Sequence, residues 1–166
     1  MSGNGKEILA DFPRTAHDHK KCVADALAEA ERLCAESGVR LTVLRRRVLE
    51  LVWSSHRPLG AYEILEMLRQ ERGRAAPPTV YRALDFLLEH RLIHRIESLN
   101  AVVGCAAPDH RHGGQFLICT ECGMTAELDD DALSRRVRDR AARLGFVVQE
   151  QIVEISGLCP DCAARS

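Results

Sequence analysis

Long apolar segments are missing from this 166-residue sequence. No uncharged apolar run approaches the ~18–20 residues needed to span a membrane. Residues 1–11 lack a basic region followed by an apolar stretch, so no secretory signal is visible. The seven cysteines are an odd number, whereas a secreted disulfide framework normally uses an even number. We therefore expect a cytoplasmic protein with no membrane partner, whose reduced cysteines have another role.

Net charge is also almost absent, at −1 from 23 basic and 24 acidic residues. Taken over the whole chain, this balance argues against nucleic-acid binding, because nucleic-acid-binding domains are usually basic. The distribution is uneven, however: residues 32–99 carry a net +4, between flanks of −2 (1–31) and −3 (100–166). This asymmetry suggests an anion-binding module joined to a second part, although an unevenly charged surface gives the same pattern.

Catalytic motifs are missing as well. No nucleophile–base pair or carboxylate pair with catalytic spacing is evident, so we expect neither an enzyme nor a small-molecule substrate. The composition, 46% hydrophobic and 28% charged, is that of a globular protein.

Apolar spacing predicts an α+β fold that begins with a winged helix-turn-helix. Apolar residues first recur at the spacing of helices, and the last of these predicted helices begins at Pro77. After it the repeat shortens to two residues, which predicts a hairpin of two strands. Four helices and a hairpin in this order are typical of a winged helix-turn-helix. The expected helices are 20–36, one capped by Thr42, 61–71 and one from 77; the hairpin strands are 92–97 and 101–105.

The rest of the chain predicts a small α/β domain. Its expected elements are strands at 115–119 and 125–128, a helix that starts at the acidic residues 129–131 and ends before Gly145, and a last strand at 146–155. The resulting division is a flexible tail (1–19), a winged-helix DNA-binding domain (20–99), a hinge (100–105) and a second domain (106–166).

The fourth predicted helix is the candidate DNA reader. Its apolar residues cluster on one face, Arg82 points away from them, and Thr79 and Tyr81 lie on the flanks. An exposed arginine near the N-terminus of such a helix is placed to bond a guanine edge in the major groove, while Tyr81 could contact a phosphate or a thymine methyl. A surface arginine beside a half-buried tyrosine is the plainer interpretation of the pair alone.

Other residues are weaker candidates for DNA contact. Tyr62, near the start of the third helix, either contacts the DNA backbone or packs into the core. Arg40, Arg45, Arg46 and Arg47 are candidate phosphate contacts, although helix arginines are usually solvated.

Two CxxC pairs predict a structural metal site. Cys119 and Cys122 form the first pair, and Cys159 and Cys162 the second. Two such pairs complete a tetrahedral Cys₄ zinc shell, which leaves no open position for catalysis. The alternative is a thiol oxidoreductase, but thioredoxin-like motifs open a long helix and only four residues follow Cys162.

A second group of candidate ligands comes from both predicted domains. His94 falls on the apolar face of its strand, where a lone histidine would be a core residue. Cys105 ends the paired strand, and His110, His112 and Glu127 follow. A mixed sulfur, nitrogen and oxygen shell suits Zn²⁺, whereas a purely nitrogen and oxygen shell would suit Fe²⁺ or Mn²⁺ better. One ion bound from both domains would fix their relative angle and so act as a switch.

Three stretches of sequence resemble the ferric uptake regulator family, most closely its zinc uptake regulator branch. They are PTVYRAL (78–84), LIHRIE (92–97) and FLICTECG (116–123), and the resemblance covers roughly residues 22–162. It implies a homodimeric, metal-dependent bacterial regulator whose second domain is the dimerisation domain. Such proteins bind AT-rich palindromic operator DNA when zinc is plentiful and usually repress zinc-uptake genes.

The resemblance also implies two zinc ions per chain. The structural ion falls on Cys119, Cys122, Cys159 and Cys162, and the regulatory ion on His94, Cys105, His112 and Glu127. His112 is preferred to His110 because its seven-residue distance to Cys119 matches the family. Iron, nickel or peroxide remains an alternative signal within the family.

Overall fold

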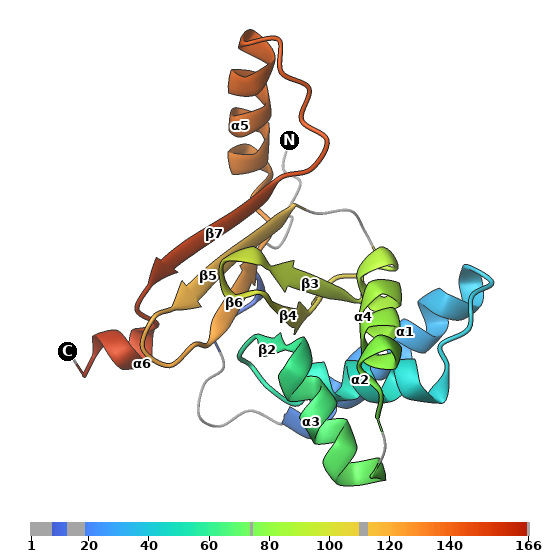
Figure 1. Cartoon of the computed structure of the whole chain (residues 1–166). Coiled ribbons are helices and arrows are strands. Elements are labelled where there is room, and N and C mark those ends of the chain that lie inside the picture. The colour runs from blue at the N-terminus through green and yellow to red at the C-terminus, as the bar shows by residue number, and fades with distance from the viewer. Residues whose placement is uncertain (1–7, 13–18, 74, 110–112, 166) are drawn as a thin grey trace. The chain divides into compact units, whose positions relative to one another are not determined.

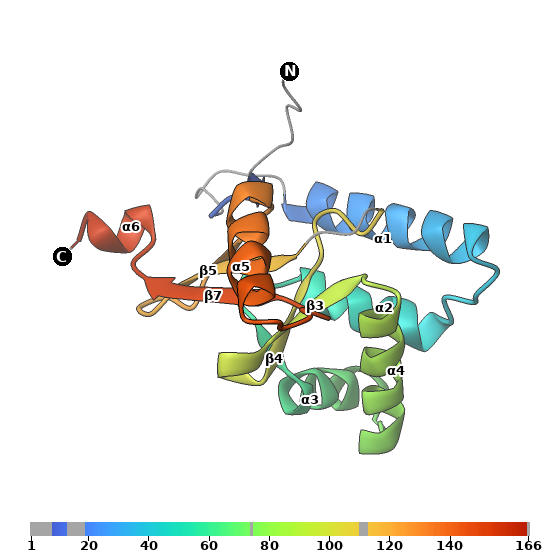
Figure 2. The same ribbon diagram turned by 90° about the horizontal axis from the view of Figure 1, so that it is seen from above.

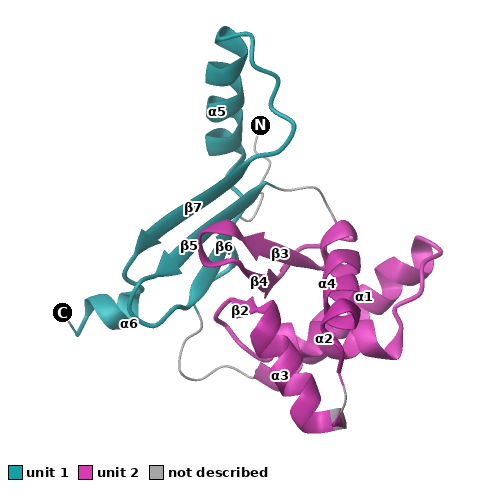
Figure 3. Cartoon of the chain, viewed as in Figure 1, with its two compact units in different colours: residues 1–12, 110–166 teal, residues 13–109 magenta. Residues whose placement is uncertain are grey.

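The computed structural model describes residues 8–12, 19–73, 75–109 and 113–165. The chain forms two compact units (Figure 3). We call residues 13–109 the helical unit and residues 1–12 with 110–166 the sheet unit. Among the described helices, none combines the length and the apolar character needed to cross a membrane.

Helices make up most of the described part of the helical unit (Figure 1). The sequence explains where they begin: the Thr42 hydroxyl accepts a hydrogen bond from the Arg45 backbone N–H at 3.3 Å, and Pro77 occupies the first turn of the fourth helix, where no backbone donor is needed. Helix α1 lies alongside α2 (Figures 1 and 2). The helices are α1 (His19–Glu36), α2 (Val43–Trp53), α3 (Ala61–Arg72) and α4 (Pro77–Glu89).

A three-stranded antiparallel sheet completes the helical unit. Its order is β2 (Leu59–Gly60), β4 (Ala101–Gly104), β3 (Ile93–Ile96). The short 3-10 helix η1 (Glu97–Leu99) and Asn100, at φ 46°, turn β3 into β4. Apolar residues of all four helices and of the sheet share one core, and each fully buried Leu or Ile contributes about 1.5–3 kcal/mol. The predicted winged helix-turn-helix is confirmed.

Within the described residues of the sheet unit, the strands form one sheet in the order β1-β6-β5-β7. Strand β7 runs parallel to β5, and the other pairs are antiparallel. A parallel pair needs a crossover connection, and α5 lies in the segment that supplies it. The elements are β1 (Ile8–Ala10), β5 (Gly114–Cys119), β6 (Thr125–Leu128), α5 (Asp131–Arg143), β7 (Ile152–Gly157) and α6 (Pro160–Ala163).

Helix α5 is anchored to the sheet at its N-terminus. The Asp130 carboxylate accepts hydrogen bonds from the backbone N–H groups of Ala132 and Leu133. The buried Gln115 side chain donates to Ser134 Oγ at 2.9 Å and to the Asp130 carbonyl at 3.0 Å. Beyond this anchor α5 extends past the end of the sheet (Figure 1), and within the described residues Ser134 is its one buried residue.

Three sequence predictions differ from the structure. Within the expected tail 1–19, Ile8–Ala10 is a strand that pairs with β6. The expected hinge 100–105 contains β4, which pairs with both β2 and β3, so the division between the units falls after Asp109. The last strand starts at Ile152 rather than at Phe146, because the pairing with β5 begins there.

Candidate metal centre and nucleic-acid interface

The two CxxC pairs come together in the sheet unit. The sulfur atoms of Cys119, Cys122, Cys159 and Cys162 all lie within 4.8 Å of one another. The Sγ atoms of Cys122 and Cys159 are 3.7 Å apart, close to the ~3.8 Å edge of a tetrahedron with Zn–S bonds of about 2.3 Å. Three of the four cysteines are buried, and Phe12 packs against the cluster. The residues present therefore fit a closed, structural Cys₄ zinc site.

Local backbone structure turns each CxxC pair toward one point. Gly123 adopts φ 74°, which residues with a side chain rarely adopt, and its N–H donates to the Cys119 carbonyl at 2.9 Å. Cys159 caps the short helix α6, where the Ala163 N–H donates to its carbonyl at 2.9 Å. Both turns place the two sulfur atoms of a pair on the same side of the chain.

Backbone donors prepare one of the thiols for metal. The N–H groups of Cys122 and Cys159 lower the pKa of Cys119 to about 6, and the second of these bonds measures 3.3 Å. The Arg165 guanidinium donates to Cys162 Sγ at 3.2 Å and lowers its pKa, but the thiols of Cys159 and other neighbours together with burial outweigh this and raise it to about 12. These backbone donors thus favour the thiolate of Cys119, the form in which a cysteine binds metal.

The structure does not favour a thiol oxidoreductase. Cys159 opens a helix of only four residues, not the long helix that activates a redox CxxC. The Cys159 side chain is 3% exposed and lies against the sulfurs of the other pair. This enclosure fits a metal ligand better than a nucleophile open to a disulfide substrate.

Two candidate ligands of the second site lie together in the helical unit. In the register of β3 and β4, His94 is opposite Val103, and the Cys105 N–H donates to the Leu92 carbonyl at 3.1 Å. Cys105 and His94 are thus diagonal neighbours on one face of the sheet, and their ligand atoms lie within 4.8 Å. His94 is half-buried and Cys105 is buried. The interpretation of His94 as a core residue with no metal partner is therefore weaker than it was from the sequence alone.

The other two predicted ligands belong to the sheet unit. Glu127 lies on β6 opposite Phe116 of β5, and its side chain is only 4% exposed. A buried carboxylate needs a charged or hydrogen-bonding partner. His110 and His112 lie outside the described residues, so the choice between them remains a prediction.

Helix α4 presents the predicted reading face to solvent. Val80, Leu84 and Leu87 are buried in the core, whereas Thr79 and Arg82 are exposed and Tyr81 is 55% exposed. Within the described chain, no ion pair involves Arg82. A proline-initiated helix with an exposed arginine and tyrosine in its first turns has the shape and charge to enter a major groove.

The weaker candidates for DNA contact divide into two groups. Tyr62 is 68% exposed, which removes the alternative that it packs into the core, and Arg40 is also exposed. Arg45, however, stacks over the Phe86 ring at 3.6 Å and donates to the Arg40 carbonyl at 2.7 Å. Nothing in the sequence indicates this stack, because Arg45 and Phe86 lie on different helices with no shared periodicity.

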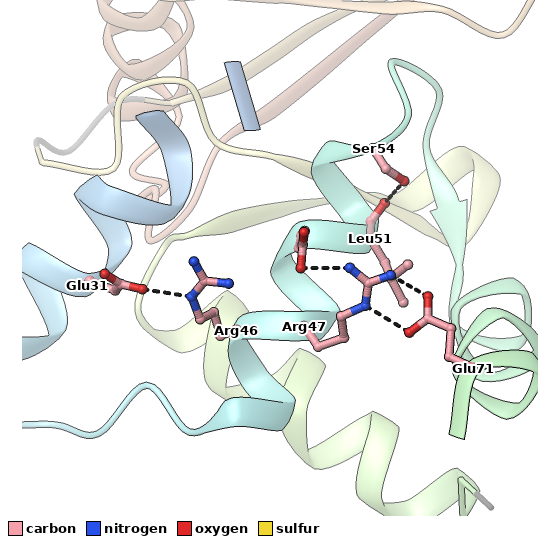
Figure 4. A network of polar contacts seen from close by, with 7 residues as sticks. Glu31, Arg46, Arg47, Leu51, Ser54 and Glu71 are labelled. Carbon is pink, nitrogen blue, oxygen red and sulfur yellow. Dashed lines mark hydrogen bonds and ion pairs between the residues drawn. The ribbon is translucent and has the colours of Figure 1, made fainter. Parts of the chain in front are cut away.

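Ion pairs hold the next two arginines (Figure 4). Arg46 reaches Glu31 of α1 at 2.7 Å, and Arg47 pairs with Glu50 and with Glu71 of α3. These contacts join neighbouring helices, so the guanidinium groups of Arg46 and Arg47 already have carboxylate partners within the chain.

The chain is similar to known proteins over most of its length. The sequence profile of the ferric uptake regulator family matches residues 36–156. The zinc uptake regulation protein of Escherichia coli (strain K12) is 39% identical over 144 residues, which cover 86% of this chain and 84% of that protein. A solved zinc uptake regulator in complex with zinc and DNA gives a TM-score of 0.82 at 38% identity, covering 86% of this chain and 96% of that chain. Holo XcZur gives a TM-score of 0.79 at 43% identity, covering 84% and 98%.

Proposed function

The chain belongs to the ferric uptake regulator family, and on that premise we propose that it is a zinc-responsive transcriptional regulator that binds operator DNA. It is a regulator and not an enzyme. The observation that carries the proposal lies in the helical unit: a histidine–thiol pair, His94 and Cys105, occurs in the same compact unit as the exposed Arg82 face of α4. A candidate sensor and a candidate reader thus belong to one compact unit.

We assign two zinc ions to each chain. The first is structural and held by the four clustered cysteines. The second is regulatory, and its proposed ligands are His94, Cys105, His112 and Glu127. The thiol of Cys105 supports zinc over iron, because Fe²⁺ and Mn²⁺ prefer nitrogen and oxygen donors. Ligands drawn from both units would let the ion select one arrangement of the two, which is how occupancy would control DNA affinity.

The functional form is a homodimer. Exposed large apolar side chains between residues 144 and 158 of the sheet unit support this, since a subunit interface would remove them from water. Two-fold symmetry would match a palindromic, AT-rich operator with the two α4 helices in successive major grooves. The regulator would act in the cytoplasm, where it would repress zinc-uptake genes. The exposed side chains include Leu144, Phe146, Val147, Ile152, Ile155 and Leu158.

Operator binding against buffered free zinc tests the proposal. The probe is a labelled duplex recovered by in vitro selection with the zinc-loaded protein, and anisotropy is measured alongside zinc content per chain. We expect tight binding only when two zinc ions are bound per chain. Parallel titrations with Fe²⁺, Ni²⁺ and peroxide test the alternative signals, and activation by one of them instead of zinc would replace zinc as the signal.

Cys105→Ser provides the matched variant for the regulatory site. It should keep the fold and the first zinc ion while losing the zinc-dependent increase in DNA affinity. Cys22→Ser, which changes a half-buried thiol of α1 outside both groups, is the control and should behave as wild type. If Cys105→Ser still responds at the wild-type zinc concentration, the regulatory ligands are misassigned.

A further inference from the structure

Trp53, the only tryptophan in the chain, lies at the C-terminus of α2 and covers the backbone of Gly104. A Cβ atom built on Gly104 would lie 2.3 Å from Cε2, 2.5 Å from Nε1 and 2.8 Å from Cδ2 of the indole. No carbon atom tolerates such distances. A glycine inside a strand often marks a close approach of this kind, and here only glycine leaves room for the indole.

Gly104 is the last residue of β4 and immediately precedes Cys105. Its position is fixed on one side by pairing with Ile93 of β3 and on the other by the indole of Trp53. The next hydrogen bond, from the Cys105 N–H to the Leu92 carbonyl at 3.1 Å, continues the strand register. The indole therefore packs at the residue that sets the direction in which the Cys105 side chain leaves the sheet.

We propose that Trp53 is a positioning residue for the second metal site: by packing on Gly104 it holds the end of β4 so that Cys105 and His94 present their ligand atoms to one ion. This inference rests on the proposed regulatory site. Metal ligation is sensitive to small displacements, because Zn–S and Zn–N bonds have narrow length ranges and a tetrahedral arrangement. Residues that orient a ligand without touching the metal commonly change affinity by 10- to 100-fold.

The same contact links the site to the reading helix. Trp53 ends α2, whose buried residues share one core with those of α4. Arg45, also on α2, stacks over Phe86 of α4 at 3.6 Å. Helix α2 thus contacts the ligand strand at one end and α4 near the other. Packed side chains of α2 therefore lie between the end of β4 and α4.

A steric double-mutant cycle tests the proposal. Co²⁺ is titrated into protein whose Cys₄ site already holds zinc, and the thiolate-to-cobalt charge-transfer band reports binding at Cys105. Gly104→Ala should weaken Co²⁺ binding at least tenfold, because the new methyl group collides with the indole. Trp53→Leu should weaken it a few-fold, through lost packing. The double variant should bind about as well as Trp53→Leu alone, because the smaller side chain admits the methyl group.

The controls separate positioning from general stability. Gly157→Ala adds the same methyl group to β7, where an added Cβ has no heavy atom within 4 Å, and should bind Co²⁺ as wild type does. Far-UV circular dichroism and the zinc content of the Cys₄ site should be the same in every variant. If Gly104→Ala folds poorly, Trp53→Leu compared with wild type still decides the question: a few-fold loss of Co²⁺ affinity with an unchanged zinc content of the Cys₄ site is expected, and wild-type affinity would overturn the proposal.

Two results would overturn the proposal and can be told apart. The first is an unchanged Co²⁺ affinity in Gly104→Ala, or a double variant whose affinity falls by the product of the two single decreases. Either outcome would show that Trp53 is not a positioning residue and would leave the proposed regulatory site intact. A wild-type chain that shows no charge-transfer band after its Cys₄ site is filled would remove both the positioning role and the proposed regulatory site.

Discussion

Arg47 on α2 and Glu71 on α3 form a forked ion pair, in which both carboxylate oxygens accept hydrogen bonds from one guanidinium. Glu50 adds a third contact to Arg47 at 2.7 Å. Glu71 and then Glu50 raise the pKa of Arg47 above its ordinary value, so the arginine is charged at every physiological pH. The pair joins two helices that also share the main core (Figure 4).

Removing this pair should destabilise the helical unit modestly. Arg47→Met should lower the free energy of unfolding by about 1 kcal/mol, the upper range for a partly exposed pair, because its geometry is bidentate. Urea denaturation measures the change. Lys21→Met removes the fully surface pair with Asp25, whose side chains are 72% and 66% exposed, and should change stability very little. Equal decreases in the free energy of unfolding in both variants would show that the ion pairs of Arg47 stabilise the protein no more than a fully exposed pair does.

Arg82 should read bases rather than phosphates. Arg82→Ala should cost about 1–3 kcal/mol on a selected operator and relax the base preference at one position of each half-site. Binding to a panel of single-substitution duplexes at fixed salt measures both effects. Arg136→Ala, on the exposed surface of α5, is the control and should bind like wild type. A uniform weakening across all duplexes would instead make Arg82 a phosphate contact.

The Cys₄ cluster should be essential to the sheet unit. Cys119→Ser should lose the structural zinc ion and with it the folding energy that the ion supplies. Metal analysis and sedimentation should show one zinc ion fewer and a loss of dimers. Cys22→Ser is again the matched thiol control. Dimers with full zinc content in Cys119→Ser would disprove the assignment of the four ligands.

Cys34 should be unreactive in the folded chain. Burial raises its pKa, partly offset by Arg45, so the folded state keeps the thiol protonated above the ordinary pKa of about 8.5. The thiol loses its proton at a lower pH in the unfolded chain than in the folded chain. Burial therefore contributes its full amount to the free energy of unfolding below the ordinary pKa, and this contribution is lost as the pH rises. At pH 8, iodoacetamide should label Cys22 well before Cys34. Above pH 9, the free energy of unfolding should fall less in Cys34→Ala than in wild type. Faster labelling of Cys34 than of Cys22, or a larger fall in Cys34→Ala, would contradict the burial of this thiol.

Apolar residues after α5 should stabilise the dimer. Leu144 and Val147 are 87% and 80% exposed in the single chain, so replacing them with serine should leave the fold of one chain intact. The dimer dissociation constant, measured by sedimentation equilibrium, should rise at least tenfold in the double variant. Val43→Ser changes a residue of the helical unit that is 69% exposed and should leave it unchanged. A dimer unaffected by the double variant would place the interface elsewhere.

Local chemistry explains which parts of the fold were predictable. Thr42 and Asp130 are strong N-caps, Pro77 marks the first turn of α4, and each acts within a few residues of its own position. The two CxxC pairs were equally informative, since four thiolates at that spacing have few uses besides metal binding. These signals identified the winged helix, the exposed face of α4 and the cluster of four cysteines.

The features that sequence analysis missed depend on distant partners. Strand β1 is three residues long and exists because β6 offers it hydrogen bonds; nothing in its own spacing distinguishes it from a tail. The exposure of Tyr62 and the indole of Trp53 on Gly104 are likewise set by tertiary packing. Since Trp53 and Gly104 lie on different elements, neither periodicity nor propensity connects them.

The position of the four cysteines has a consequence for chain length. Metal bound by both CxxC pairs would close residues 123–158, with β6, α5 and β7, into a single loop whose two ends are joined by the ion. The entropy of closing a loop grows only with the logarithm of its length, so one extra helical turn in α5 would cost about 0.1 kcal/mol. The length of α5 can therefore change, by engineering or by natural insertion, with almost no effect on the free energy of closing the loop at the four cysteines.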